Sequence, residues 1–109
     1  MIYPRMLRIR QRFPAQRVED IPAEVARQLS RLELGEKVRA GDTVAISVGS
    51  RGIANIAMIT KAIANHVKSL GATPFLVPAM GSHGGGTADG QRGLIEAYGV
   101  TEEFTGAEI

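Results

Sequence analysis

Hydrophobic and polar residues follow two different periods along the chain, and these periods predict strands and helices in alternation. Within residues 6–13, arginines alternate with Leu7, Ile9, Gln11 and Phe13, which is typical of a strand with one basic face. Two short apolar runs, residues 43–48 and 73–78, indicate strands buried on both faces, as in a parallel sheet. The three- to four-residue spacing of apolar side chains predicts helices over residues 54–70 and 88–98.

Residues typical of helix ends support this division of the chain. Asp20 followed by Pro22 marks the start of an earlier helix, because proline is tolerated in the first turn. Thr87 is placed to cap the start of the last predicted helix. Gly71 and Gly99 are placed to end the two predicted helices, where a left-handed backbone is common.

The order strand, helix, strand, helix predicts the fold class. We expect an α/β fold, specifically a three-layer, Rossmann-like domain with a mostly parallel sheet. The length of 109 residues suits one domain, and residues 100–109 are expected to lead toward another strand. Ligands of such sheets bind outside the carboxyl ends of the strands. Loops 49–52 and 79–87 each follow a strand and precede a helix, so we expect them to lie side by side at that edge.

The second of these loops is the main candidate for a functional site. Its three consecutive glycines, residues 84–86, allow the backbone to approach a ligand closely, and the following helix start favours an anion. His83 beside them carries an imidazole, the side chain that most often serves in general acid/base catalysis. The spacing matches neither a Walker A loop nor a dinucleotide fingerprint. The alternative is a tight turn that needs its glycines, with Thr87 as helix cap and His83 holding the loop together.

Arg51 and His66 receive different interpretations. The guanidinium of Arg51, at the end of a buried strand, can bind a phosphate or carboxylate through two hydrogen bonds. The alternative is an ordinary surface arginine at a strand end. His66 falls in the middle of a helix, where a surface or half-buried position without a site role is expected.

Composition and charge exclude several classes of protein. The chain has no Cys and two His, which excludes disulfides, thiolate metal sites and an all-histidine metal site, so no metal ligand is assigned. No apolar run approaches the ~20 residues of a membrane span, and no signal peptide is evident, so a cytoplasmic protein without membrane contact is expected. Five arginines and no acid occur in the first 17 residues, but their strand-like alternation disfavours a mitochondrial presequence. An aromatic content of 5% disfavours nucleic-acid binding, and the basic strand is expected to face solvent or another subunit of a homo-oligomer.

Two segments resemble the N-terminal domain of the nickel-dependent lactate racemase family. They are residues 47–52 and 76–87, and the second carries the Pro-Ala-Met-Gly-Ser-His-Gly-Gly stretch of a broad, largely uncharacterised branch. The resemblance extends from about residue 20 to residue 109. The family loop Asp-x-Thr-Arg-Pro corresponds to residues 48–52, where the arginine and a hydroxyl are kept, and Gly-Thr-His-Arg corresponds to residues 81–84, where glycine replaces the arginine. These departures leave the fold assignment intact but do not support lactate as the substrate.

The resemblance implies an isomerase that racemises or epimerises a small 2-hydroxy acid by hydride transfer with a nickel-pincer nucleotide. It implies that this chain is the first of two domains and is inactive alone, because the C-terminal domain would carry the metal-binding histidine and the lysine that attaches the cofactor. We therefore predict His83 as the catalytic acid/base. The predicted cofactor-binding residues are Ser50, Arg51, Gly81, Ser82 and Gly84. A non-catalytic, Rossmann-like module that binds an ordinary nucleotide or anion is the alternative.

Overall fold

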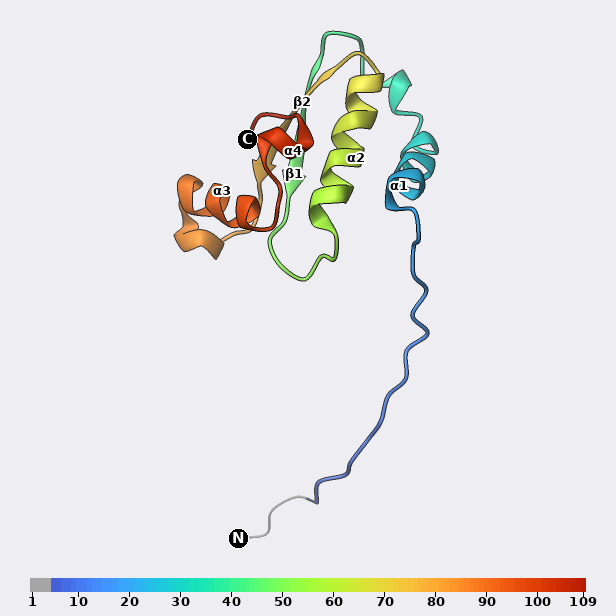
Figure 1. Cartoon of the computed structure of the whole chain (residues 1–109), viewed down its shortest axis with the longest axis vertical. Coiled ribbons are helices and arrows are strands. Elements are labelled where there is room, and N and C mark those ends of the chain that lie inside the picture. The colour runs from blue at the N-terminus through green and yellow to red at the C-terminus, as the bar shows by residue number, and fades with distance from the viewer. Residues whose placement is uncertain (1–4) are drawn as a thin grey trace.

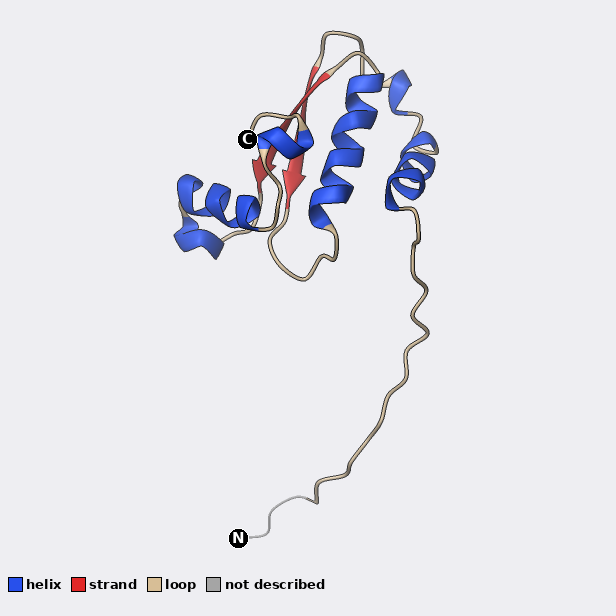
Figure 2. Cartoon of the chain, in the orientation of Figure 1, coloured by secondary structure: helices blue, strands red, loops and turns tan. Residues whose placement is uncertain are grey.

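Two parallel strands, β1 (Thr43–Val48) and β2 (Thr73–Pro78), form the sheet at the positions that the apolar runs predicted. The computed structural model describes residues 5–109 (Figures 1 and 2). The strands pair along their whole length, from Thr43 opposite Thr73 to Val48 opposite Pro78. On the other edge of β2, Phe75 makes one parallel bridge to Glu108, so the C-terminal segment does approach the sheet as expected.

The helices begin and end close to their predicted positions. Asp20 caps the first helix by accepting a hydrogen bond from the Ala23 N–H, and Thr87 caps the third by accepting one from Gly90. Gly71 and Gly99 follow helix ends with φ of 81° and 84°, as predicted. The short fourth helix and the two 3-10 turns were not predicted. The elements are α1 (Ile21–Ser30), η1 (Leu34–Glu36), α2 (Ile56–Ser69), η2 (His83–Gly86), α3 (Ala88–Ala97) and α4 (Glu102–Thr105).

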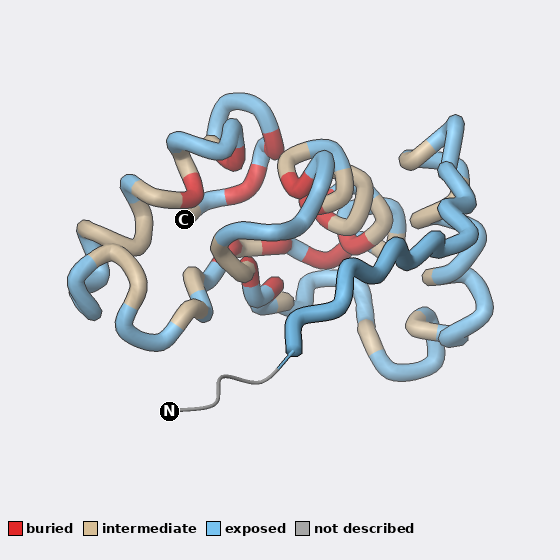
Figure 3. Tube along the Cα trace, turned by 90° about the horizontal axis from the view of Figure 1, so that it is seen from below, coloured by how far each residue is buried: buried red, intermediate tan, exposed pale blue. Residues whose placement is uncertain are grey.

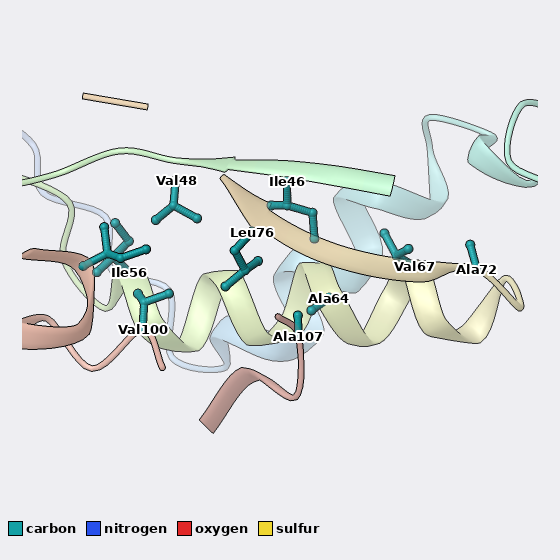
Figure 4. Packing of buried hydrophobic residues seen from close by; sticks show 10 residues of the cluster. Ile46, Val48, Ile56, Ala64, Val67, Ala72, Leu76, Val100 and Ala107 are labelled. Atoms are coloured by element: carbon teal, nitrogen blue, oxygen red, sulfur yellow. The ribbon is translucent and has the colours of Figure 1, made fainter. Parts of the chain in front are cut away.

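The hydrophobic core lies between one face of the sheet and α2 (Figure 4). Side chains of Ile46 and Leu76 point from the strands toward Ala64 of α2, and the C-terminal segment adds Val100 on the same side. Figure 3 shows these buried positions grouped in the middle of the molecule. The buried hydrophobic residues are Ile46, Val48, Ile56, Ala64, Val67, Ala72, Leu76, Ile95, Val100 and Ala107.

The opposite face of the sheet is uncovered in the part of the chain that the structure describes. Ala45, Ser47 and Val77 are exposed, and burial alternates along β1. Burial on both faces, which the apolar runs predicted, is therefore wrong for residues 5–109. The reason is that α2 covers one face of the sheet while α1 and α4 pack on α2. The structure is thus α/β with a two-stranded parallel sheet, and a third layer is not seen among residues 5–109.

Residues 6–13 do not form the predicted strand. The chain before α1 runs away from the body as an extended trace (Figure 1). Leu7, Ile9 and Phe13 are 85%, 84% and 74% exposed. The prediction fails here because a strand needs a neighbour for its backbone hydrogen bonds, and neither β1 nor β2 pairs with this segment.

Candidate active site

The loops that follow β1 and β2 lie side by side, as the topology predicted. The Ala79 N–H donates to the Val48 carbonyl at 2.8 Å, which extends the ladder just beyond the strands. Further along the two loops, Ser50 Oγ lies 2.6 Å from His83 Nδ1, although the residues are 33 positions apart in the sequence. The structure therefore brings two of the predicted site residues into direct contact at the carboxyl edge of the sheet, where ligands of parallel sheets bind.

The contact between Ser50 and His83 can prepare the imidazole for proton transfer. Both residues are half-buried. The hydrogen bond forms either with the serine hydroxyl as donor or with a protonated Nδ1 as donor, depending on the tautomer of the ring. In the second arrangement Nε2 carries the lone pair and can accept a proton from a substrate. In that arrangement the imidazole has a free basic nitrogen while its other nitrogen is held by Ser50.

The three glycines of η2 have left-handed backbones but different surroundings. Gly84, Gly85 and Gly86 have φ of 62°, 71° and 68°. A Cβ on Gly84 would lie 2.5 Å from the carbonyl carbon and oxygen of Gly90, so Gly84 allows the loop to pack on α3. A Cβ on Gly85 or Gly86 would meet no atom within 4 Å. Gly84 is therefore explained by packing, whereas the backbone of the next two glycines is open to a ligand.

The remaining predicted residues lie at the same edge and are exposed. Arg51 directly follows Ser50, and Ser82 directly precedes His83 without capping η2 through its side chain. The space around Gly81 is open, and its carbonyl accepts a hydrogen bond from Gln91 Nε2 at 2.7 Å. These positions are accessible to a ligand, and their roles in cofactor binding remain predictions.

Two side chains of α3 near this edge were missed by the sequence analysis. Gln91 joins the helix to the glycine-rich loop through Gly81. Arg92 donates to the Glu96 carboxylate at 2.9 Å and to the Glu102 carboxylate at 2.8 Å. The hydrogen bond to Glu96, together with the charge of Glu102, raises the pKa of Arg92 above its ordinary value. Glu96 lies four residues after Arg92 on the same helix, so this pair could have been read from the sequence. The contacts of Gln91 with Gly81 and of Arg92 with Glu102 have no sequence signal, because only the tertiary fold brings those partners close.

A cavity of about 330 Å³ lies between the end of β2 and α3. Arg92 and Asp89 supply charged groups to its wall, and Val77 and Pro78 supply apolar surface. Ser50 and His83 are not among its lining residues. The contact between Ser50 and His83 therefore lies outside this cavity.

The described residues offer no complete metal site. Nowhere in residues 5–109 do three His, Cys, Asp or Glu side chains cluster closely enough to hold a metal ion. His66 lies half-buried in the last turn of α2 and belongs to neither loop, in agreement with its interpretation from the sequence. Within the same range, none of the helices has the length and apolar character needed to cross a membrane.

Comparison of the chain with models of protein families found no match. Searches of curated proteins and of solved structures likewise found no protein similar to it. The likeness to the lactate racemase family therefore rests on the motif residues alone, and any function assigned through it is a proposal.

Proposed function

We propose that this chain is the N-terminal domain of a 2-hydroxy-acid racemase or epimerase that works with a nickel-pincer nucleotide. The observation that carries the proposal is the 2.6 Å contact between Ser50 Oγ and His83 Nδ1 at the carboxyl edge of two parallel strands. Oxidation of a 2-hydroxy acid at C2 requires a base for the hydroxyl proton, and a half-buried imidazole held at Nδ1 offers such a base at Nε2.

The chemistry assigns separate tasks to the two side chains. Racemisation through a ketone breaks the O–H bond and the C2–H bond of the substrate. His83 would accept the hydroxyl proton as the hydrogen on C2 leaves as a hydride. It would return the proton to the same oxygen when the hydride adds back to the opposite face of the ketone carbon. When bound, the cofactor supplies the acceptor for that hydride. Ser50 would accept the hydrogen bond from Nδ1–H and so keep the basic nitrogen directed at the substrate.

The residues at this edge fit the phosphate of such a nucleotide, whereas they do not supply its metal site. Arg51 places an exposed guanidinium beside Ser50, and Gly85 and Gly86 leave open backbone where a Cβ would otherwise stand. No group of possible ligands in residues 5–109 could hold nickel. In the proposed cytoplasmic enzyme a second domain therefore holds the metal, and further chain covers the open sheet face to complete the three-layer, Rossmann-like domain.

A non-catalytic module that binds an ordinary nucleotide or anion is the second candidate. The open glycines and the exposed Arg51 favour it, because they serve anion binding without any use of His83. The two candidates differ in what they require of the imidazole and of the nucleotide base.

The test compares turnover and nucleotide preference. The full-length protein that contains this domain, loaded with cofactor, is given single enantiomers of several 2-hydroxy acids, and their optical purity is followed by chiral chromatography, with cofactor-free protein as the control. The present chain is titrated with nicotinic acid mononucleotide and with AMP. The proposal predicts loss of optical purity that depends on cofactor, and a preference for the nicotinic acid nucleotide. Full retention of optical purity with every acid, together with a preference for AMP, would favour the binding module instead.

A further inference from the structure

We propose that residues 6–13 bind as a third, parallel strand along the free edge of β1 in the same chain. The extended arrangement before α1 is then the open state of a strand that docks and detaches (Figure 1). The inference stands apart from the proposed function, because it concerns the edge of the sheet and not the pair of loops at its end.

The edge of β1 that faces away from β2 carries backbone groups without a strand partner in residues 5–109. The Thr73 N–H donates to the Asp42 carbonyl and the Ala79 N–H donates to the Val48 carbonyl. Because backbone groups alternate in direction along a strand, the intervening odd-numbered positions of β1, such as Ala45, point their N–H and C=O groups outward. An exposed edge of this kind is a template for one more strand.

The alternation in residues 6–13 matches what this edge requires. If the odd-numbered residues share the face of Ile46, then Leu7, Ile9 and Phe13 extend the buried side of the sheet next to α2, and the polar Gln11 lies among them. The arginines between them then fall on the opposite face at the border of the sheet, where their long side chains reach water even when that face is covered. In the open state the three apolar side chains are almost fully exposed, so docking removes a large apolar area from water.

The path of the chain favours docking within one molecule and fixes the direction of the strand. Arg17 and Val18 share a surface pocket with Ala54 and Asn55, which lie between β1 and α2. The segment therefore joins the body near the carboxyl end of β1, the end at which α1 also begins (Figure 2). Residues 14–16 supply roughly 10 Å of extended chain, at about 3.4 Å each, between Arg17 and the proposed strand.

A strand that ends near the carboxyl end of β1 must run parallel to it. The connection from residues 6–13 through α1 to β1 then forms a strand–helix–strand unit, the usual way to join parallel strands. In the register that we propose, Phe13 lies level with Val48, so Pro14 falls just beyond the last residue of β1. In this register Arg10 lies beside Ala45 on the uncovered face.

Disulfide trapping tests this register, since the natural chain contains no cysteine. The double variant Arg10→Cys with Ala45→Cys places both thiols on one face, whereas the control Gln11→Cys with Ala45→Cys places them on opposite faces. Both variants are oxidised mildly at low protein concentration and analysed by non-reducing electrophoresis and mass spectrometry. The proposal predicts a monomer with an internal disulfide that forms several-fold faster in the first variant. Equal rates in the two variants, or covalent dimers in place of cross-linked monomers, would overturn it.

Hydrogen exchange provides a second measurement that needs no engineered thiol. Docking predicts slowed exchange of the Ala45 and Ser47 amides in the natural chain. The double substitution Ile9→Asp and Phe13→Asp should abolish that protection and leave the amide of Leu76, on β2, protected as before. Fast exchange of Ala45 and Ser47 in the natural chain would contradict the docked strand.

Discussion

Ser50 Oγ and His83 Nδ1 lie 2.6 Å apart and join the loops that follow the two strands of the sheet. From the sequence, Ser50 is predicted to bind the cofactor and His83 to be the catalytic acid/base. A serine hydroxyl both donates and accepts, so the contact holds the ring in place and is compatible with either tautomer. We propose that Ser50 accepts from Nδ1–H and is a positioning residue for His83.

Replacing the Ser50 hydroxyl should change the tautomer of His83. In Ser50→Ala the acceptor for Nδ1–H is gone, so the ring should shift toward the tautomer protonated at Nε2, whereas Ser50→Thr should keep the natural tautomer. Nitrogen-15 NMR of the imidazoles distinguishes the two forms. His66 serves as the internal control, since it lies on α2 outside both loops. Identical His83 signals in the natural chain and Ser50→Ala would show that the contact does not set the tautomer.

Removing the guanidinium of Arg51 should weaken the binding of nicotinic acid mononucleotide. A charge-assisted hydrogen bond contributes about 1–3 kcal/mol, which corresponds to a loss of affinity of roughly 5- to 150-fold in Arg51→Ala. Titration calorimetry measures the change. Arg31→Ala is the matched control, because it removes another exposed arginine, at the end of α1. An equal affinity of the two variants would remove Arg51 from the phosphate site.

The same substitution at two glycines of α3 should change stability in opposite directions. Gly90→Ala would place its Cβ against the backbone of Gly84, and such overpacking costs about 1–3 kcal/mol. Gly93→Ala has no atom within 4 Å of its Cβ and should stabilise the helix by about 0.5–1 kcal/mol. Urea denaturation of both variants gives the two free energies of unfolding. A stable Gly90→Ala variant would mean that the loop does not pack on α3 at Gly84.

The regular elements were predictable because short-range patterns determine them. The apolar run of β1 and the helical spacing of α2 are local properties, and Thr87 and Gly71 mark element ends through their own side-chain and backbone chemistry. The meeting of the two loops was also predictable, since it follows from the direction of parallel strands and needs no knowledge of side-chain contacts.

Features that depend on distant partners could not be read in this way. A short apolar run can form a strand with one face covered or with both faces covered. The exposure of Ala45 and Val77 could therefore not be predicted from the sequence. The alternation in residues 6–13 predicts a strand but does not show which other strand it would pair with. The contact of Ser50 with His83, and of Gln91 with Gly81, depends on distances that only the folded chain defines.

The turnover of the His83→Asn variant tests the central claim most directly. The full-length protein with this substitution, loaded with cofactor, is assayed for racemisation of its 2-hydroxy acid, and His66→Asn is the control. Loss of a general base predicts a fall in kcat of about 10²–10⁴, with cofactor content unchanged and with normal turnover in the control. A near-normal kcat in His83→Asn would contradict the account, because the proton of the substrate hydroxyl would then pass to some other group.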